Sequence, residues 1–506
     1  MSLQPDYSSF AATYDSGKPQ VVWRILVADL ETPVSAFLKL TNGQPNAFLL
    51  ESVEGGAVRG RYSILGLKPD LMWKCAGNQA WINRNVRSKA GGFVPCPVAE
   101  ASGALDSLRA LIAECSIDTP PNLPPMSAGL IGYMSYDMVR LVEKLPDANP
   151  DLIKVPDGIF MRPTIMAVFD NVNGTLTAVT SVWPRPGVDA PTAWDLACER
   201  LEHVVEALES PLPHSDAGSS RAEHQPIPVP GVSPEHYCRM VEKAQEYIAA
   251  GDIFQVVLSQ RLAVPFKLPP FSLYRSLRRL NPSPFLFFLD FGEFQLVGSS
   301  PEILVRLRDD KITIRPIAGT RRRGKTPAED DELAADLLAD PKELAEHLML
   351  LDLGRNDVGR VAAIGSVSVT KKMAVEYYSH VMHIVSNVEG TIRPGCDAMD
   401  ALMAGFPAGT TSGAPKIRAM EIIDELETER RSFYAGAIGY FDGNGNMDSC
   451  IALRTTLVKD GTMYVQAGAG IVADSVPLSE HEECMNKARA LVRAAEDAID
   501  YTLNKQ

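Results

Sequence analysis

The second half of the chain is a close succession of strand-like segments separated by very short turns, and this pattern constrains the fold most. Alternating and β-branched residues predict strands at 253–264, 285–291, 294–297, 303–308, 311–317, 434–441, 447–458 and 462–472. Turns such as Gly292-Glu293 are too short for a parallel crossover, so neighbouring strands should pair antiparallel. Helices expected at 341–353, 396–404, 415–428 and 479–499 are long enough to cover the sheets. We therefore expect an α+β fold with large, mainly antiparallel sheets under helices.

Residues 210–232 divide the chain into two predicted domains. They hold five prolines among Ser, Gly and Asp without apolar periodicity, which is typical of a linker. The first domain, 20–209, mixes helices with strands. Its expected elements are a helix starting at Thr32-Pro33, a strand at 46–52 before a Glu54-Gly55-Gly56 turn, a hairpin at 165–183 and a helix at 194–208. The second domain, 233–497, opens with a helix from Ser233-Pro234 to Gly251.

Composition limits the classes of function. The net charge is −14 and the pI is about 5.2, whereas a nucleic-acid surface needs clustered Lys and Arg, so no nucleic-acid partner is expected. The eight cysteines include no Cys-x-x-Cys pair, so neither a zinc site nor a disulfide framework is indicated. The N-terminus lacks signal-peptide features, and no apolar run approaches the ~20 residues of a membrane span. We expect a cytoplasmic protein without a membrane partner.

A helix start is clearest at Asp340-Pro341, an N-cap residue followed by a proline at the first helical position. Gly354 marks its expected end. Three leucines at helical spacing predict its buried face: Leu344, Leu348 and Leu351. A second helix near the end of the chain is expected to have Ser479 as its N-cap, with Glu482 at the capping-box position.

Both helices carry paired glutamates three residues apart near their starts, Glu343 with Glu346 and Glu480 with Glu483. Such carboxylates repel each other unless a cation lies beside them, and a hard cation with oxygen ligands is the usual solution. Glu343 alone fits a capping box equally well, and a solvated charged face is the alternative for either helix. The two pairs together favour a metal site.

Several strands carry polar residues that are candidates for chemistry. Alternation from residue 253 places Gln255, Ser259 and Arg261 on one face, which should line a cavity. Glu302 begins a strand and is a candidate general acid, although an ordinary edge glutamate is the simpler interpretation. His383 lies among apolar residues in mid-strand, where hydrogen-bonded packing is commoner than catalysis.

Two further features suggest an anion site. Arg454 lies inside an apolar strand segment, and a buried arginine usually pairs with a carboxylate, which a ligand could supply. Gly468-Ala469-Gly470 is expected to end a strand with backbone N–H groups open to an anion. The Gly-rich turn at 406–416 has the wrong spacing for a phosphate-binding P-loop, so ATP binding is not supported.

Four segments resemble the chorismate-utilising enzymes: Asp352-Leu353-Gly354-Arg355-Asn356-Asp357, the 409–416 turn, Pro316-Ile317-Ala318-Gly319-Thr320 and Glu480-x-x-Glu483-x-x-Asn486-Lys487. The likeness covers about 233–495. Leu49-Leu50-Glu51-Ser52 extends it toward component I of anthranilate synthase. The resemblance implies a two-domain sandwich, with a tryptophan-sensing domain at 20–209 and a chorismate-binding catalytic domain at 233–497.

The resemblance also implies site roles. Mg2+ would be bound directly by Glu346 and Glu483, with Glu343 and Glu480 supporting it through water. Chorismate contacts are implied for Gly319, Thr320, Thr410, Tyr434, Arg454, Gly468, Ala469, Gly470 and Lys487. The implied inhibitor contacts for tryptophan are Ser52, Pro284, Phe285 and Leu286, and Phe285 stands where many relatives have tyrosine.

Two positions indicate which reaction is expected. Relatives that add water carry lysine at the position of Gln255, and the aminodeoxychorismate enzymes carry lysine at the position of Ala318. Water needs a base to become a nucleophile whereas neutral ammonia already offers a lone pair, so Gln255 fits amination. We expect ammonia to add to the ring, Glu302 to protonate the departing hydroxyl, and His383 to assist the loss of pyruvate. The product would be anthranilate, at the first step of tryptophan biosynthesis.

Ammonia implies a partner. None of the eight cysteines has the Gly-x-Cys-x-Gly setting of an amidotransferase nucleophile, so a separate glutamine amidotransferase subunit is expected, in a heterotetramer of two large and two small subunits. Two alternatives remain. Ala318 counts against an aminodeoxychorismate synthase component I, and the four glutamates count against a non-catalytic tryptophan-sensing subunit.

Overall fold

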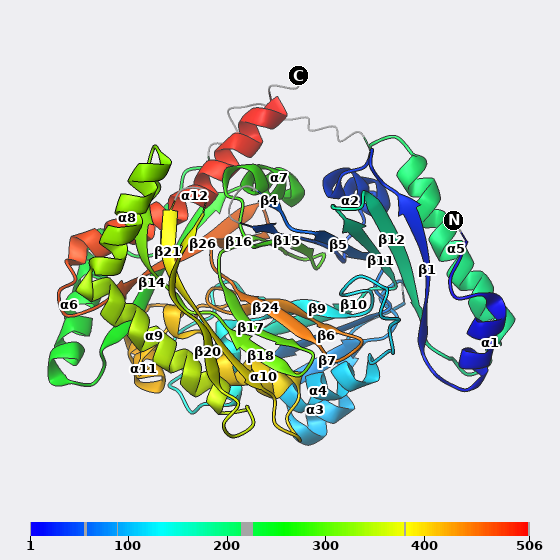
Figure 1. The fold of residues 1–506 in the computed structure, drawn as a ribbon, viewed down its shortest axis with the longest axis horizontal. Helices are drawn as coiled ribbons and strands as arrows, with labels where there is room; N and C mark the ends of the chain where they lie inside the picture. The colour runs from blue at the N-terminus through cyan, green and yellow to red at the C-terminus, as the bar shows by residue number, and fades with distance from the viewer. Residues whose placement is uncertain (1, 55–57, 89, 214–225, 379–380, 504–506) are drawn as a thin grey trace.

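The computed structural model describes every residue except 1, 55–57, 89, 214–225, 379–380 and 504–506. Within these residues the chain forms two large sheets of twelve strands each, which face each other with helices on their outer sides (Figure 1). The paired strands run antiparallel, as the short turns predicted. The expected α+β sandwich of large antiparallel sheets is confirmed.

The first sheet contains strands from both halves of the chain. Its order is β1 (Gln20–Val27), β12 (Thr175–Val182), β11 (Ile165–Asp170), β5 (Tyr62–Leu67), β2 (Ala47–Glu51), β15 (Phe285–Asp290), β16 (Gln295–Ser300), β25 (Thr455–Lys459), β26 (Thr462–Ile471), β14 (Gln255–Pro265) and β13 (Val229–Pro230), with β22 (Gly413–Ala414) paired to β14.

The second sheet likewise contains strands from both halves of the chain. Its order is β19 (Ile317–Arg322), β21 (Val381–Thr391), β18 (Lys311–Ile314), β17 (Ile303–Arg308), β24 (Met447–Ile451), β23 (Ala437–Asp442), β9 (Gly129–Met134), β10 (Gly158–Arg162), β6 (Leu71–Ala76), β7 (Gln79–Asn83) and β8 (Val94–Pro95), with β20 (Ser368–Tyr377) paired to β21. A small hairpin joins β3 (Val53–Glu54) to β4 (Val58–Arg59).

Hydrogen bonding crosses between the halves in both sheets. β2 pairs with β15 in the first, where Glu51 lies opposite Leu286, and β9 pairs with β23 in the second. β13 also lies within the segment expected to be a linker. The division at 210–232 remains a prediction about the chain, but the two halves complete each other's sheets.

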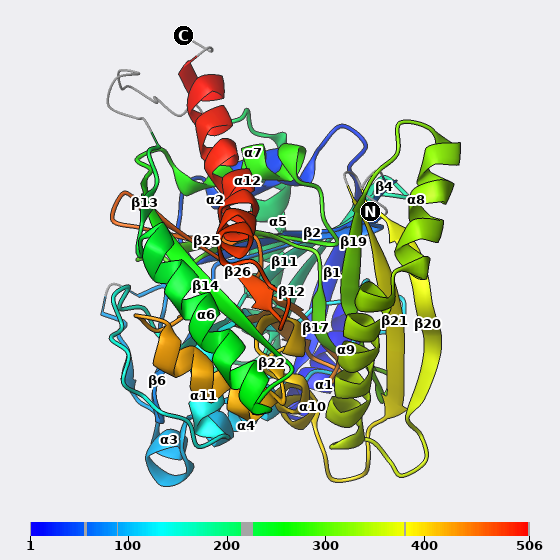
Figure 2. The same ribbon diagram turned by 90° about the vertical axis from the view of Figure 1, so that its left-hand side faces the viewer.

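The helices cover the outer faces. Those packed on the first sheet are α2 (Pro33–Thr41), α5 (Ala190–Glu209), α7 (Pro270–Leu280) and α12 (Pro477–Leu503), with α1 (Tyr7–Asp15) against α5 and β1. Those on the second sheet are α3 (Pro97–Ser102), α4 (Ala104–Glu114), α8 (Pro327–Ala339), α9 (Pro341–Gly359) and α10 (Ala398–Gly405). Two more, α6 (Pro234–Ala250) and α11 (Lys416–Leu426), pack against β14. Figure 2 shows α6, α9, α11 and α12 on one side of the molecule.

Local signals placed several elements correctly. Thr32 forms a capping box with Ser35 at the start of α2, and Ser233 accepts from the His236 backbone N–H at the start of α6. α6 ends at Gly251 with a left-handed φ of 84°. The hairpin at 165–183 is confirmed as β11 and β12. The Glu54-Gly55-Gly56 turn lies largely outside the described residues.

The expected end of α9 at Gly354 was wrong, because the helix continues to Gly359. A Cβ at Gly354 would lie 3.3 Å from Pro316, so the glycine permits close packing of helix on sheet rather than a cap. The expected buried leucines were also partly wrong. Leu348 is 52% exposed, whereas Leu350 and Leu351 are buried.

Three other expected boundaries differ. The segment at 447–458 breaks into β24 and β25, which belong to different sheets, and Arg454 in the break has φ 46°. The segment at 311–317 likewise divides into β18 and β19. α12 begins at Pro477, ahead of the expected cap Ser479. No helix in the described part of the chain combines the length and apolar character needed to cross a membrane.

Candidate active site

The first turn of α9 is fixed by its cap and by one arginine. Asp340 accepts from the backbone N–H groups of Lys342 and Glu343 at 3.0 and 3.3 Å. Arg321 of β19 donates to Asp340 at 2.8 Å and to Glu343 at 3.2 Å. The Glu343 side chain therefore pairs with Arg321 and does not form the alternative capping box, while Asp340 and Arg321 hold the carboxylate in place.

Glu346 lies one turn further along α9 and meets β14. Gln255 Nε2 donates to Glu346 Oε1 at 3.1 Å. Gln255 is only 4% exposed, and its Oε1 has no hydrogen-bond partner among the described residues. Glu346, an expected metal ligand, thus contacts Gln255, the residue expected to select the nucleophile. The Oε1 atom of Gln255 remains as a buried acceptor.

α12 brings the second glutamate pair close to the first. Glu483 pairs with Lys487 at 2.7 Å, and Lys487 also donates to the Gly468 carbonyl at 3.0 Å. Burial raises the pKa of Glu480, and so does the neighbouring Glu483, while the charge of Lys342 on α9 opposes the shift. This interaction with Lys342 shows that the two helix starts are neighbours.

The carboxylates suit a hard dication. Burial raises the pKa of Glu343, the hydrogen bond from Arg321 opposes this shift, and the charge of Glu346 adds to it. Within the described residues, no three His, Cys, Asp or Glu side chains converge to enclose a metal ion. Mg2+ does not need such a cage, because it usually keeps several waters and uses one or two carboxylates. Glu346 and Glu483 could serve as these two.

Glu302 is a buried acid, not an exposed edge residue. It precedes β17, is 6% exposed, and accepts one hydrogen bond from Thr410 Oγ1 at 3.0 Å. Burial raises its pKa to about 8, and the Thr410 bond opposes this shift only in part. Glu302 is therefore protonated at neutral pH and can donate a proton.

His383 on β21 is held as a proton acceptor, whereas Glu302 is held as a proton donor. Its Nδ1 lies 3.0 Å from the Gly319 carbonyl and 3.1 Å from Thr320 Oγ1. A carbonyl can only accept, so Nδ1 carries the hydrogen and Nε2 keeps a lone pair. Burial lowers the pKa of His383, and the nearby charges of Arg454 and Lys487 lower it further. The imidazole is therefore neutral and can accept a proton at Nε2.

The expected substrate contacts surround these groups. Arg454 has no acidic partner among the described residues, and burial lowers its pKa, so a bound carboxylate would suit it. Gly319 and Thr320 lie on β19 beside His383. Tyr434 is buried.

Gly468-Ala469-Gly470 lies at the end of a strand as expected, because β26 ends at Ile471. These residues lie within β26 and pair with β14 on one side, while β25 pairs with β26 only as far as Val465. A Cβ at Gly468 would lie 2.9 Å from Tyr434 Oη, and one at Gly470 would lie 2.7 Å from Gln255 Nε2. The glycines leave room for these two side chains, and one edge of the strand remains open beside them.

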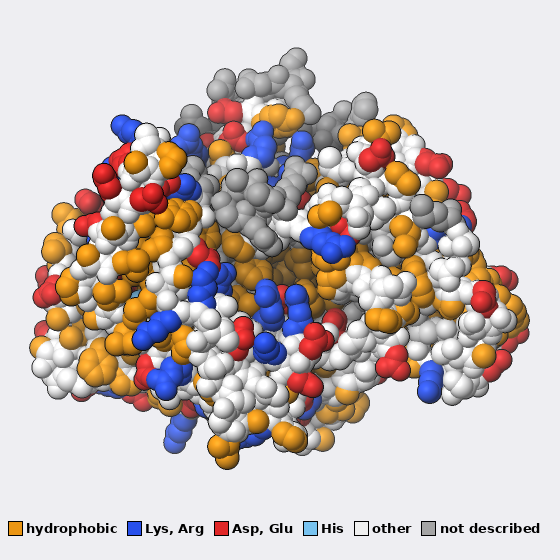
Figure 3. Space-filling view, viewed as in Figure 1, with side chains coloured by type: hydrophobic (Ala, Val, Ile, Leu, Met, Phe, Trp, Pro, Cys, Tyr) orange, Lys and Arg blue, Asp and Glu red, His pale blue; other side chains and the backbone are white. Residues whose placement is uncertain are grey.

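The expected inhibitor residues line a separate cavity between the sheets. The cavity has a volume of about 690 Å³, and Ser52, Pro284, Phe285 and Leu286 contribute to its wall from the first sheet. Figure 3 shows a hollow at the centre of this face, with Lys and Arg side chains around it. Tyr378 also lines the cavity, and its ring centroid lies 5.3 Å from that of His383. One aromatic side chain thus separates the two sites.

Sequence reasoning missed several residues that hold the site together. Arg321 fixes the start of α9, Tyr378 lies between the site and the cavity, and Arg431 and Glu427 bond to the backbone at one edge of β14. Arg321 follows a recognised motif and could have been suspected as a cation for the nearby carboxylates. Glu427 and Arg431 lie four residues apart and pair with each other, but their contacts with β14, like the position of Tyr378, depend on partners distant in the chain.

Comparison with known proteins agrees with this arrangement. A family model described as chorismate binding enzyme matches residues 78–493. The chain belongs to this family.

The relatives identify a branch of the family. The chain is 56% identical over 499 residues to anthranilate synthase component 1 of Cereibacter sphaeroides, covering 97% of each chain. It is 49% identical over 474 residues to the protein of that name from Pseudomonas putida, covering 92% of this chain and 93% of the other. The crystal structure of anthranilate synthase component I from Streptococcus pneumoniae matches with TM-score 0.74 and 38% identity, over 93% of this chain and 99% of that one.

Proposed function

We propose that this chain converts chorismate and ammonia to anthranilate and pyruvate, as the large subunit of an anthranilate synthase. One observation carries the proposal. A buried carboxyl with a pKa of about 8, Glu302, and a neutral imidazole with an unshared Nε2, His383, lie at one site. An acid and a base held in these states suit a reaction that expels a hydroxyl group and later removes a ring proton.

Gln255 is the residue to which we assign binding of the nucleophile, ammonia. Its Nε2 is engaged by Glu346, and its unpartnered Oε1 can accept a hydrogen from incoming ammonia. Ammonia needs no base to become nucleophilic, which matches the absence of a lysine at this position and at Ala318. After the nitrogen adds to the ring, Glu302 delivers its proton to the departing hydroxyl, which leaves as water.

His383 is assigned to the elimination. Its Nε2 takes the ring proton, the ring becomes aromatic, and the enolpyruvyl group leaves and gains a proton to give pyruvate. Arg454 and Lys487 bind carboxylate charge, and the open edge of β26 offers backbone N–H groups. Mg2+, held by Glu346 and Glu483 and supported by Glu343 and Glu480, would supply positive charge for the substrate carboxylate.

Regulation and partners follow as part of the proposal. The cavity beside Ser52 and Leu286 has the size of a small-ligand site and combines apolar walls with polar groups, which suits tryptophan as a feedback inhibitor. A separate glutamine amidotransferase subunit would supply ammonia, in a cytoplasmic assembly of two large and two small subunits. Aminodeoxychorismate synthase component I and a non-catalytic tryptophan sensor are the alternatives, and the buried acid and base argue against the second.

The test is product identity with the purified chain alone. Given chorismate, Mg2+ and an ammonium salt at mildly alkaline pH, it should release pyruvate and fluorescent anthranilate in equal amounts. A non-aromatic amino product without pyruvate would point to the aminodeoxychorismate reaction. Isochorismate or salicylate would mean that water is the nucleophile and that Gln255 does not select ammonia.

A further inference from the structure

One edge of β14 is open in the middle. β22 pairs with this edge at Gln255 and Val256, and β13 pairs with it again at Leu262 and Ala263. Between these two short strands, the Ser412 carbonyl accepts from the Val257 N–H at 2.9 Å, and two side chains supply further contacts to the β14 backbone. Arg431 donates to the Val257 carbonyl at 2.6 Å, and Glu427 accepts from the Ser259 backbone N–H at 2.8 Å.

The Arg431 side chain is buried, and each of its three guanidinium nitrogens donates at least one hydrogen bond. It is 1% exposed and forms an ion pair with Glu427, to which Nε donates at 2.9 Å and Nη2 at 2.6 Å. Its Nη1 donates to the Thr411 carbonyl at 2.7 Å. One guanidinium therefore joins strand β14 to the loop at 409–411. Removing it would leave the buried Glu427 carboxylate without its counter-ion and the Thr411 and Val257 carbonyls without this donor.

The residue beside this contact is Thr410, which donates to Glu302. The strand beside the other contact carries Gln255, which donates to Glu346. Thr410 is one residue away from Thr411, and Gln255 is two residues away from Val257, and Arg431 donates to the carbonyls of Thr411 and Val257. A shift of the 409–411 segment would change the only hydrogen bond that the Glu302 carboxyl accepts among the described residues.

We infer that Arg431, oriented by Glu427, is a positioning residue for the reaction: it holds the 409–411 loop against β14, so that Thr410 reaches Glu302 and Gln255 stays opposite Glu346. This inference rests on the proposed function for the roles of Glu302 and Gln255. Arg431 itself touches neither of these side chains, and acts only through backbone that carries them or their partner.

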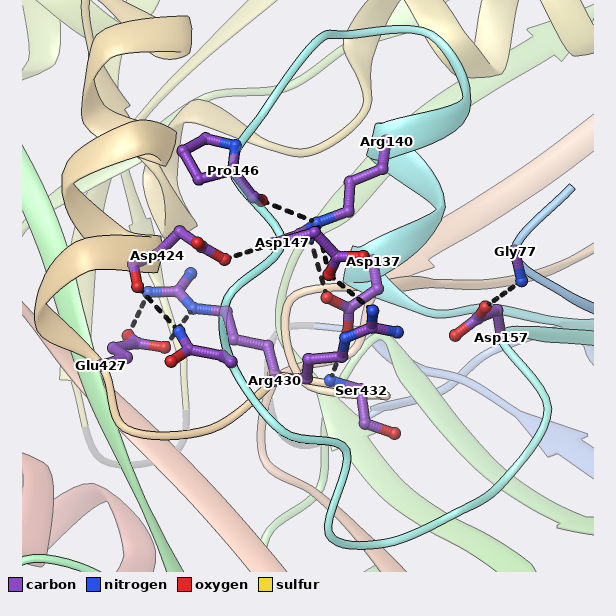
Figure 4. A network of polar contacts seen from close by, with 12 residues as sticks. Gly77, Asp137, Arg140, Pro146, Asp147, Asp157, Asp424, Glu427, Arg430 and Ser432 are labelled. Carbon is purple, nitrogen blue, oxygen red and sulfur yellow. Dashed lines mark hydrogen bonds and ion pairs between the residues drawn. The ribbon is translucent and has the colours of Figure 1, made fainter.

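The next residue in the chain provides a contrast. Arg430 pairs with Asp147, in a network that ties the loop after α11 to the first half of the chain (Figure 4). In the same network Arg140 contacts Asp137 and Asp424, and Glu427 lies at its edge. Among the described residues the Arg430 side chain has no hydrogen bond to the 409–411 loop or to β14, although its backbone carbonyl accepts from Arg261 of β14. Of these adjacent arginines, Arg430 therefore supports the fold, whereas Arg431 positions the site.

The experiment compares Arg431→Met with Arg430→Met, each measured with chorismate, Mg2+ and ammonia. Arg431→Met should lower kcat about 100-fold, because small displacements of catalytic groups cost this much, with a much smaller change in KM for chorismate. Arg430→Met should keep kcat within about threefold, as for surface ion pairs of small energetic weight. The high-pH limb of the rate profile should also move upward in Arg431→Met, since the Thr410 bond that lowers the pKa of Glu302 is lost.

A double-mutant cycle with Thr410→Val decides whether Arg431 acts through that loop. If it does, Thr410→Val added to Arg431→Met should cost little more than Arg431→Met alone. Fully additive losses, or an unchanged pH limb, would overturn the inference and leave Arg431 as a structural ion pair. If Arg431→Met does not fold, Arg431→Lys replaces it in the test. Lysine keeps the charge beside Glu427 but cannot reach both carbonyls, so this variant should show the same pH shift. If the parent forms another chorismate product, the proposed function fails, while the coupling is still read on that product's rate.

Discussion

The active site and the cavity beside Ser52 lie on either side of Tyr378 but are built in contrasting ways. In the active site, buried polar groups are held by specific partners, such as Thr410 on Glu302 and Gly319 on His383. Those residues all come from the second half of the chain. The cavity is open, with a volume of about 690 Å³, and its walls come from both halves. In the proposed function, catalysis would use prearranged groups, whereas regulation would use a space that both halves enclose.

This contrast implies that changes on the two sides of Tyr378 should have separate effects. Substitutions in the active site should reduce turnover without changing sensitivity to tryptophan. Substitutions in the cavity should do the reverse. A variant that changes both would mean that the two regions are coupled through the shared wall.

The largest effect is expected for Glu302→Gln, which keeps the shape of the side chain but removes its proton. Turnover should fall by about 10² to 10⁴-fold, the usual contribution of a general acid, while tryptophan sensitivity of the residual activity stays at the parent value. Initial rates of anthranilate fluorescence check this. Glu421→Gln on the surface of α11, which removes an ion pair with Arg418, is the control. Near-parental turnover in Glu302→Gln would exclude this residue as the acid.

The next effect is expected for Glu346→Gln and Glu483→Gln at limiting Mg2+. Each should lose more than about 100-fold in activity, because even changes in groups behind a metal ligand cost 10- to 100-fold in affinity. Titration of rate against Mg2+ measures the shift, and chelation of the metal should abolish activity in the parent. Glu482→Gln, exposed on the same helix, is the matched control. Identical Mg2+ titrations for all three variants would make the glutamates ordinary surface charge.

A smaller, graded effect is expected from pH. Since burial raises the pKa of Glu302 to about 8, the acid is protonated below that value and loses its proton above it. With neutral ammonia kept saturating at each pH, kcat should fall about tenfold per pH unit above this pKa. The rate profile of the parent, beside that of Glu302→Gln, measures the limb. A limb that persists unchanged in the Gln variant belongs to another group.

The smallest effect on turnover, and the sharpest test of the contrast, is expected for Ser52→Phe. A phenyl ring at this wall would fill space needed by an indole, so inhibition by tryptophan should be lost while kcat changes less than about twofold. Inhibition curves at fixed chorismate measure this. Ser16→Phe, at an exposed helix end, is the control. Parental inhibition in Ser52→Phe would place the inhibitor elsewhere.

The sequence predicted those parts of the molecule whose causes are local. The caps at Asp340, Thr32 and Ser233, and the antiparallel pairing of strands joined by short turns, depend on residues a few positions apart. The end of α9 does not, because Gly354 packs against Pro316, which lies between β18 and β19. The break between β24 and β25 was missed for the same reason, since sheet membership is decided by partners far away.

The site divides in a similar way. Motif resemblance named Glu302, His383 and Gln255, and the structure gives each a defined environment. It could not predict that Glu302 is buried against Thr410, or that Glu343 pairs with Arg321, since both depend on packing between distant segments. Arg431 and Glu427 pair with each other at a spacing of four residues, but their contacts with β14 and the 409–411 segment could not be predicted, because these are to backbone carbonyl and N–H groups that every residue possesses.

The shared sheets also bear on how the protein is made. During synthesis the first half of the chain leaves the ribosome before β15 and β23 exist, so the edges of β2 and β9 that these strands will cover are then open. Open strand edges readily pair with other chains. The nascent protein therefore passes through a stage in which it is exposed to aggregation until about half of its length has followed, and translation speed and chaperone supply should govern its yield.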